Sequence, residues 1–462
     1  MIKRCIVLFA LLIVSLELET QAEEFTLLKK SFWGQAWESS EGVFLSQLDQ
    51  LYYATPNKQG YSFESRLKVG VSVTKDMGAH FGYDVNGRVW GLMPKEASTW
   101  IDIRSAYIEW HNLQKTNLFV KVGRVLPNWG GMDEYSPIKE IFPKLVIDPL
   151  ESRSNGIIGL YGRIEEETLD FEALGSPLFI PNLGGALYET DTSGKFYSPS
   201  RWAMPLYDTA TVGKAAVPLD YKIHLPQRPA DIASVIFKLG GGVRITLRDF
   251  YDQYRFSALM MHAMDPDGRM EIQGKLTTGT STKNNTLTGQ VDLYPRFFRH
   301  TVYALEGNIQ GSRVDLHMES AYRIPDNSQD LSEYMIKPIE WKNFFAFQTK
   351  NEISFLPQVL LGLVLTRQFD PYQDPSYKIP SRSLNNVVGK LYWKPLSKLS
   401  AFSASEVALS LKEGIWKNGI EWTPLNHLNI STGIDLIMGQ SDTYWGFLRH
   451  QDRLWLRGTY AF

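Results

Sequence analysis

The chain has 462 residues with a mean hydropathy of −0.22, and 13% of them are aromatic. Lys and Arg number 48 against 50 Asp and Glu, a balance that gives no reason to expect nucleic-acid binding. Beyond residue 22 the longest apolar run is 359–365, which excludes a membrane-spanning helix there. A membrane protein of this kind must cross the bilayer with the strands of a closed barrel.

Residues 1–22 are predicted to be a cleaved signal peptide. Lys3 and Arg4 precede an apolar stretch at 6–16, and small residues ending at Ala22 provide a cleavage site. A retained membrane anchor is the alternative, although the apolar stretch is short for a bilayer span. Because the only cysteine lies in this segment, the exported chain would contain no disulfide.

The next segment, residues 23–42, has two interpretations. Its apolar and aromatic residues, which include Trp33 and Trp37, suit a short periplasmic or plugging helix, and a strand that precedes the barrel fits equally well. The first barrel strand is then expected at 43–53. The barrel domain as a whole is predicted to cover residues 23–462.

Apolar and polar residues alternate with a period of two in many segments, for example in 61–73, 313–324, 342–352 and 428–438. This pattern predicts β-strands with one apolar and one polar face. A soluble β-sandwich shows the same alternation. The pattern of connections therefore has to decide between a sandwich and a barrel.

The strands fall into two groups, with roughly nine up to residue 260 and roughly nine from residue 300 onward. The stretch between the groups is either a loop or two further strands. Single-chain bacterial barrels close with an even number of strands. We therefore expect an all-β fold, a transmembrane antiparallel up-and-down β-barrel of about 18 strands, with 16 or 20 as alternatives.

Short and long connections alternate along the chain. The short ones are expected at 76–78, 114–116, 166–168, 240–242, around 311, 355–357 and 425–427, and the long ones at 92–98, 130–154, 181–230, 325–340, 371–384 and 440–452. Tight turns at one end of a barrel and loops at the other end produce this alternation. If the C-terminus lies in the periplasm, the long connections are extracellular.

The long connection 181–230 is the predicted candidate for an element that narrows the pore, because loops of this length are usually functional or disordered. It contains several prolines, basic residues and Trp202. Folded inward, its basic and aromatic side chains would contact an anionic or sugar-like solute. Folded outward, it would be a surface loop or a lid, which is the interpretation we favour slightly.

The last ten residues, 453–462, alternate between an apolar or aromatic face and a face with two arginines. A terminal strand of this kind behind an export signal resembles the porin-type outer-membrane β-barrels of Gram-negative bacteria. In that class the barrel-assembly machinery reads an aromatic-x-aromatic ending, which Tyr460 and Phe462 match, after a glycine five residues before the end. Here that position is arginine and the glycine is Gly458. The resemblance implies an outer-membrane location and outer-membrane lipids and the assembly machinery as partners.

A second resemblance lies at 122–130, where Gly-Arg is followed by Trp-Gly. This pattern is similar to one in alginate-export-like porin families, and it implies passage of a carbohydrate polymer or another bulky solute. A tryptophan at the lipid interface followed by a tight turn is the alternative interpretation.

A barrel of about 18 strands is wide enough to enclose a water-filled channel. The candidate pore-lining residues lie on the polar faces of the predicted strands: Glu64, Arg66, Lys68, Arg88, Arg104, Lys121, Arg313, Asp315, His317, Glu319, Arg323, Lys342, Lys350, Glu352, Lys417, Glu421, Arg453 and Arg457. Their basic excess predicts passive diffusion of small hydrophilic solutes, anionic or sugar-like, with a weak anion preference. Cross-strand ion pairs that only stiffen the wall are the alternative.

Three other functions are weighed against a porin-like channel: export of a polysaccharide or bulky solute, a structural or surface-binding barrel with a plugged pore, and an outer-membrane hydrolase. The eight histidines are scattered, and none lies in the His-x-Ser-Asn-Gly arrangement of outer-membrane phospholipases. We therefore predict neither an enzyme nor a cofactor. Asp315, His317 and Glu319 share a strand face and could bind a metal, but a hydrated cluster is the favoured interpretation. A monomer and a trimer are both compatible with the sequence.

Overall fold

The computed structural model describes most of the chain from residue 41 onward. The described residues are 41–54, 63–76, 81–93, 99–111, 117–131, 136, 138–146, 148–182, 189–190, 196–197, 202, 209–212, 215–223, 236–249, 253–266, 269–281, 284–310, 314–326, 342–352, 359–369, 385–408, 412–425, 427–440 and 443–461. The predicted signal peptide and nearly all of the segment 23–42 lie outside them. In the described part of the chain, no helix is long and apolar enough to cross a membrane.

Eighteen strands of the described chain form one sheet. They are β1 (Glu41–Tyr53), β2 (Phe63–Asp76), β3 (Phe81–Met93), β4 (Thr99–His111), β5 (Leu118–Val125), β8 (Ile157–Glu165), β9 (Leu169–Ser176), β14 (Gly240–Arg248), β15 (Tyr254–Met264), β18 (Arg299–Gln310), β19 (Val314–Pro325), β20 (Lys342–Glu352), β21 (Val359–Phe369), β22 (Asn385–Leu396), β23 (Leu399–Ala408), β24 (Glu413–Leu425), β25 (Leu428–Met438) and β26 (Arg453–Ala461).

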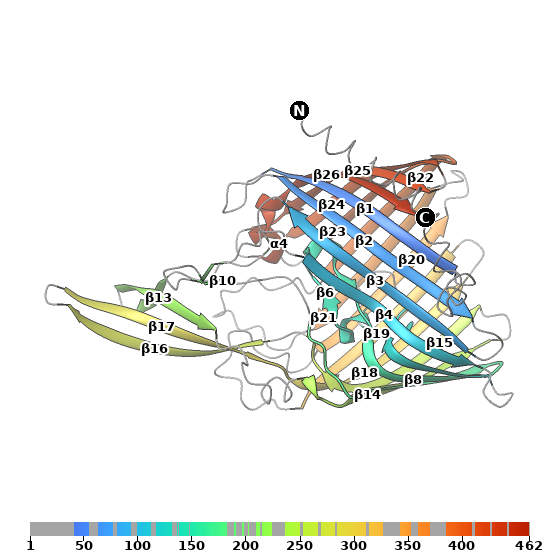
Figure 1. Cartoon of the computed structure of the whole chain (residues 1–462), viewed down its shortest axis with the longest axis horizontal. Coiled ribbons are helices and arrows are strands. Elements are labelled where there is room, and N and C mark those ends of the chain that lie inside the picture. The colour runs from blue at the N-terminus through green and yellow to red at the C-terminus, as the bar shows by residue number, and fades with distance from the viewer. Residues whose placement is uncertain are drawn as a thin grey trace, which may run out of the picture.

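Each strand pairs antiparallel with the next, and the sheet closes on itself because β26 also pairs with β1. Leu45 lies opposite Ala461 in this last pairing, and Tyr53 lies opposite Arg453. The chain therefore forms the closed 18-stranded antiparallel barrel that the alternation predicts (Figure 1). Since β1 already pairs with β2 on its other side, it has no edge left for a preceding strand.

The stretch between the two groups of strands forms a hairpin outside the wall. Strands β16 (Arg269–Ser281) and β17 (Asn284–Arg296) join β12 (Thr209–Val212) and β13 (Ala215–Ile223) in a four-stranded sheet, in which β13 and β17 run parallel. Figure 1 shows this sheet projecting from one end of the barrel. The hairpin extends an external connection, so it leaves the strand number of the barrel unchanged.

Short connections between the strands alternate with longer ones, as the sequence predicts. One expected short turn is wrong: residues 240–242 begin β14, and the turn lies at 249–253. These glycines permit a close approach of neighbouring strands, because a Cβ on Gly241 would lie 2.7 Å from the carbonyl oxygen of Leu174. In a sequence, three consecutive glycines usually indicate a turn. Here they lie within a strand and allow the backbone of the neighbouring strands to approach closely.

The two faces of the barrel wall meet different surroundings. On the outer face apolar side chains are exposed, while the polar side chains beside them in sequence are buried on the inner face. Val69 is 45% exposed, whereas Lys68 is 3% exposed; Leu454 is 49% exposed, whereas Arg453 is 4% exposed. An apolar exterior around a polar interior is the arrangement of a barrel in lipid.

Candidate functional site

The connection between β5 and β8, residues 126–156, turns into the barrel; we call it the inner loop. Its Asp148 contacts Arg66 on β2, and its Ser136 contacts Glu319 on β19. Strands β2 and β19 lie nine positions apart in the ring of 18, and hence on opposite sides of the barrel. The inner loop therefore crosses the lumen and is attached to the wall at both sides.

One attachment is ionic and involves a short 3-10 helix, η4 (Pro149–Glu151). The Asp148 carboxylate caps this helix by accepting from the backbone nitrogen of Leu150 at 2.9 Å. The same carboxylate accepts from Arg66 Nη1 at 2.7 Å and from Arg453 Nη1. The side chain of Asp148 therefore both caps η4 and forms the ion pairs, and it holds the start of this helix against β2 and β26.

The second acid of η4, Glu151, contacts the same part of the wall. Its two carboxylate oxygens accept from Lys68 Nζ at 3.0 Å and from Arg457 Nη2 at 2.7 Å. In addition, Lys417 on β24 donates to the carbonyl oxygen of Leu150 at 2.9 Å. Three wall strands therefore contribute a cation that binds this end of the inner loop.

Burial and charge act in opposite directions on these two acids. Burial raises the pKa of Asp148, but the guanidinium groups of Arg453 and Arg66 outweigh it and hold the pKa below its ordinary 3.8. Burial also raises the pKa of Glu151, and the nearby cations, Lys68 foremost, hold this pKa well below 4.5. Both acids are consequently ionised at neutral pH and remain bound to the wall.

The wall supplies its own acids to the same group. Asp49 pairs with Lys68 and with Arg457, each at 2.8 Å, while Asp435 pairs with Arg453 and Glu64 with Arg66, each at 2.6 Å. We call the whole group the ionic cluster: Asp49, Glu64, Arg66, Lys68, Asp148, Glu151, Lys417, Asp435, Arg453 and Arg457. Its five cations match its five acids, so the basic residues here present little unbalanced charge to a solute.

The other attachment of the inner loop is apolar. Trp129, Ile138, Ile141 and Phe142 are all at most 2% exposed, and they pack against apolar side chains on the inner faces of β8, β9, β15, β18 and β19. Each such side chain contributes about 2 kcal/mol through burial. The indole nitrogen of Trp129 also donates to Glu172 Oε2 at 2.6 Å, so this buried tryptophan leaves no polar atom unsatisfied.

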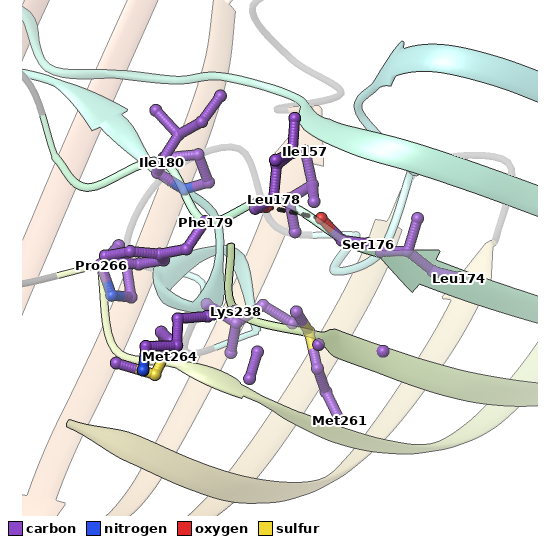
Figure 2. A pocket seen from close by; sticks show the side chains of 15 residues that line it. Ile157, Leu174, Ser176, Leu178, Phe179, Ile180, Lys238, Met261, Met264 and Pro266 are labelled. Carbon is purple, nitrogen blue, oxygen red and sulfur yellow. Dashed lines mark hydrogen bonds between the residues drawn. The ribbon is translucent and has the colours of Figure 1, made fainter. Parts of the chain in front are cut away.

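Little space remains along this apolar contact. Figure 2 shows a pocket where Ile157, Leu174 and Met261 of the wall approach Phe179 and Pro266 of the outer connections. Its volume is about 30 Å³, enough for one or two waters and too small for a solute. The inner loop is thus packed against the wall here.

A glycine sets the path of the inner loop after Trp129. Gly130 has φ +83°, and a Cβ at this position would lie 2.5 Å from Ser136 Oγ. The Ser136 hydroxyl in turn donates to Glu319 Oε2 at 2.5 Å. The Trp-Gly pair singled out in the sequence therefore turns the chain inside the barrel. The interpretation of Trp129 as a tryptophan at the lipid interface is wrong, because its side chain is fully buried.

A polar pocket of about 380 Å³ lies between the inner loop and strands β8, β9, β14, β15, β18 and β19. Ion pairs line it: Arg244 binds Glu172 at 3.1 Å and Glu306 at 2.7 Å, and Arg163 binds Asp170 at 3.0 Å. Most of the pocket wall is polar, unlike the small pocket of Figure 2.

The predicted pore-lining residues fall into three groups. Those on the inner face of the wall are Glu64, Arg66, Lys68, Lys121, His317, Glu319, Arg323, Lys417, Glu421, Arg453 and Arg457. Arg104 is exposed, at the point where the pairing of β3 with β4 shifts register. The side chains that lie outside the described part are Arg88, Arg313, Asp315, Lys342, Lys350 and Glu352.

Sequence reasoning left out the acids that hold the inner loop. Asp49 lies in the first predicted strand, but polar and apolar residues are mixed on both faces around it, as in Gln47, Gln50 and Leu51, so alternation does not single it out. Asp148 and Glu151 lie in a long connection without alternation. The available signal was the apolar content of that connection, since Ile138, Ile141 and Phe142 would be unfavourable in a water-exposed loop.

The predicted constriction at 181–230 stays a prediction, because many of its residues lie outside the described ranges. Residues 209–223 include strands of the projecting sheet. Trp202 is buried against Tyr53 of β1, with ring centroids 6.3 Å apart in an edge-on arrangement. The described residues contain no group of three His, Cys, Asp or Glu placed to hold an ion, and a metal site at His317 stays untested because the side chain of Asp315 lies outside them.

No family model and no curated protein sequence matches this chain. Among solved structures, OccK2 (OpdF) of Pseudomonas aeruginosa has 10% identity and a TM-score of 0.51, and OccK5 (OpdH) of the same species has 11% and 0.50. Both comparisons cover 92% of this chain and 98% of the other. A mutant of the Rh. blastica porin has 9% identity and a TM-score of 0.41 over 92% of this chain and all of the other. At these identities the two Pseudomonas structures show a common fold.

Proposed function

We propose that this chain, which has the fold of porin-type outer-membrane β-barrels, is a channel for passive diffusion of small hydrophilic solutes. The observation that carries the proposal is the inner loop. It crosses a closed barrel, is attached on opposite sides, and borders a polar space of about 380 Å³. A loop of this kind narrows the lumen and sets an upper limit on solute size. Solutes cross by diffusion, without a catalytic step.

The charges of the lumen support weak selectivity between ions. The sequence predicts a weak anion preference from an excess of basic residues. However, Arg66, Lys68, Arg453 and Arg457 of the ionic cluster are paired with acids, as are Arg244 and Arg163 in the polar pocket. Paired charges largely cancel at the distance of a passing ion. We therefore infer a permeability ratio for potassium over chloride close to one.

The same proposal includes the location and partners of the protein. Residues 1–22 direct export and are removed, and the barrel-assembly machinery reads the terminal strand with Tyr460 and Phe462. Outer-membrane lipids then surround the exposed apolar face of the wall. A trimer and a monomer are compatible with this arrangement.

Export of a polysaccharide is the alternative that the second sequence resemblance implies. The attachments of the inner loop weigh against it, because a polymer chain needs a passage that the loop would have to vacate. Four nearly fully buried apolar side chains and a buried ion pair would be exposed in such a movement. A small solute requires no such change.

Conductance of the purified full-length mature chain in planar lipid bilayers tests the proposal. We expect discrete steps of current in potassium chloride and a reversal potential near zero in a salt gradient. Absence of steps in protein that still shows the barrel's β-sheet circular dichroism would favour a plugged, surface-binding barrel. A strongly anion-selective reversal potential would refute the cancellation of charge.

A further inference from the structure

We infer that two arginines on the outer face of the barrel, Arg104 of β4 and Arg124 of β5, bind the anionic phosphate headgroup of a membrane lipid. We call them the outer arginine pair. The inference rests on the proposed outer-membrane location and not on the channel function, because it concerns the face of the wall that meets lipid. The acyl chains of the bound lipid would lie along the apolar wall beside the pair.

The pairing of β4 with β5 shows that Arg124 points away from the lumen. Residues that lie opposite each other in an antiparallel pair have their side chains on the same face of the sheet. Ile108 lies opposite Val122, and both side chains are exposed on the outer face. Two positions further along, Ala106 lies opposite Arg124. The side chain of Arg124 therefore leaves the wall on the side of the lipid.

Arg104 is exposed and lies close to Arg124 in the wall. It occupies the shift of register in β4 next to the exposed Ile103, whereas the inward-facing Asp102 is buried. The backbone of Gly156 connects the two arginines. Its nitrogen donates to the carbonyl oxygen of Arg104 at 2.8 Å, and its carbonyl oxygen accepts from Arg124 Nε at 3.1 Å. Both arginines thus adjoin the point where the inner loop returns to the wall.

The outer face around the pair is otherwise apolar. The other outward-facing residues of β4, β5 and β8 in the described part of these strands are Ile103, Ala106, Ile108, Trp110, Leu118, Val120, Val122, Ile158, Leu160, Gly162 and Ile164. A basic side chain on the lipid face of a barrel is unfavourable, by an amount that depends on its depth. Two such charges side by side also repel each other. An anion bound between them removes both costs.

The described chain supplies no such anion. Inside the barrel, Arg66, Arg244 and Arg453 bind carboxylates. By contrast, the side chain of Arg104 has no hydrogen bond or ion pair with any described residue, and that of Arg124 donates only to the carbonyl oxygen of Gly156. None of the outward-facing wall positions that the structure describes is an Asp or Glu. The wall of a second copy of this chain therefore offers no carboxylate either.

The chemistry of the pair favours a phosphate. The planar fork of a guanidinium matches two oxygens of a phosphate group. The exposed Arg104 can offer this fork, while the half-buried Arg124, which Gly156 holds in place, adds a second positive charge beside it. Basic groups of this kind at the edge of a membrane bind anionic lipid headgroups.

The position of the pair along the strand suits a headgroup. Arg124 is the last residue but one of β5, directly before the inner loop, which is a long connection. β5 has 8 residues, close to the roughly 9–11 that a strand needs to cross a bilayer, so its last residues reach the headgroups. If the C-terminus lies in the periplasm, as the sequence predicts, these headgroups belong to the outer leaflet.

Arg299 provides a matched control on the same face of the barrel. It begins β18 and points outward, because Tyr303, four residues along the strand, is exposed on the outer face. Its surroundings differ from those of the pair. Arg299 donates to His262 Nε2 at 3.4 Å, and Asp326 Oδ2 lies 3.7 Å from the same nitrogen. A nearby acid weakens the attraction of an anion to this arginine.

Native mass spectrometry of the purified full-length mature chain in an uncharged detergent tests the inference. The probes are dioleoyl phosphatidic acid and dioleoyl phosphatidylcholine, which have the same acyl chains, with inorganic phosphate as a competitor. We expect phosphatidic acid to bind about tenfold more tightly, because choline offsets the charge of the other phosphate. Equal binding of the two lipids would overturn the inference. Complete displacement of phosphatidic acid by inorganic phosphate at millimolar concentration would also overturn it, because the site would then bind free anions.

Variants locate the site. Combined Arg104→Gln and Arg124→Gln should weaken the binding of phosphatidic acid about tenfold, and Arg104→Gln alone about threefold, because each basic group contributes separately to the attraction. The single variant changes only an exposed side chain, so it keeps the test valid if the double variant fails to fold. Arg299→Gln should leave the affinity almost unchanged. Equal losses in Arg104→Gln and Arg299→Gln would show that overall charge binds the lipid, which overturns the location.

The same spectra distinguish a lipid site from a contact between subunits. Dimers that persist without lipid and are lost in Arg104→Gln would assign the pair to a subunit contact and overturn the inference. The channel proposal fails separately. Protein that conducts ions but does not prefer phosphatidic acid refutes the lipid site alone, whereas folded protein that binds phosphatidic acid through the pair and conducts no current refutes the channel alone.

Discussion

Arg66 donates from Nη1 to the carboxylate of Asp148 at 2.7 Å, across 82 residues of sequence, and both side chains are 1% exposed. The pair joins the barrel wall to the loop inside it. Truncating one partner of a buried ion pair usually costs about 3–5 kcal/mol, because the other charge stays buried. The position of the inner loop therefore depends strongly on this contact.

Replacement of Asp148 with asparagine should loosen the inner loop. Asp148→Asn removes the charge that balances Arg66 and Arg453, at a cost near the lower end of about 3–5 kcal/mol, since Glu64 and Asp435 still pair with these arginines. We expect a larger and noisier single-channel conductance and a reversal potential shifted toward anions. Glu421→Gln, on the inner face of β24 but outside the ionic cluster, serves as the control. Unchanged conductance in Asp148→Asn would show that the loop is held by its apolar contacts alone.

The ionic attachment should also respond to acid. The pKa values of Asp148 and Glu151 are lowered in the folded protein, below 3.8 and well below 4.5. Their contribution to stability is therefore complete above the unfolded-state values and is lost as the pH falls through the folded-state values. Single-channel conductance recorded while the pH is lowered in steps should be constant from about pH 7 to pH 5 and should become larger or noisier only below about pH 4. A transition near pH 6 would contradict the lowered pKa values.

The turn at Gly130 should not tolerate a side chain. Gly130→Ala introduces a Cβ 2.5 Å from Ser136 Oγ at φ +83°, and backbone strain of this kind costs about 1–3 kcal/mol before the collision is counted. The first part of the inner loop should shift, which lowers the temperature at which the barrel unfolds in detergent. Gly458→Ala is the control, because a Cβ there meets no atom within 4 Å. The idea fails if the two variants unfold at the same temperature.

The barrel could be predicted because the alternation of residues within each strand shows which side chains face outward and which face the lumen. In β26 the exposed Leu454 and Leu456 alternate with the buried Arg453 and Trp455, as the sequence alternation requires. Repeated along the chain, this pattern predicts strand number, the order of turns and the closing pair. The prediction failed locally at Gly240, where close packing of backbones and a turn both favour glycine.

The candidate site could be predicted only in part, because a polar face does not tell which charges meet. Arg66 and Lys68 were expected on the inner face, but their partners Asp148 and Glu151 come from a distant connection. Neither alternation nor spacing relates these positions to each other. The pairing of these charges is therefore a property of the tertiary structure, and the number of basic residues along the strands does not show which of them are paired.

Removal of the Arg244 side chain tests directly whether paired charges in the lumen cancel. Arg244→Gln leaves Glu172 and Glu306 without their shared cation, so the lumen gains one unit of unbalanced negative charge. We expect the reversal potential in a potassium chloride gradient to shift toward cations, and the shift should shrink as the salt concentration rises and screens the charge. Lys412→Gln also removes one positive charge, but at an exposed position in the connection before β24. It should shift the reversal potential far less than Arg244→Gln does. Equal shifts in the two variants would show that overall charge, and not the pairing within the lumen, controls the passage of ions.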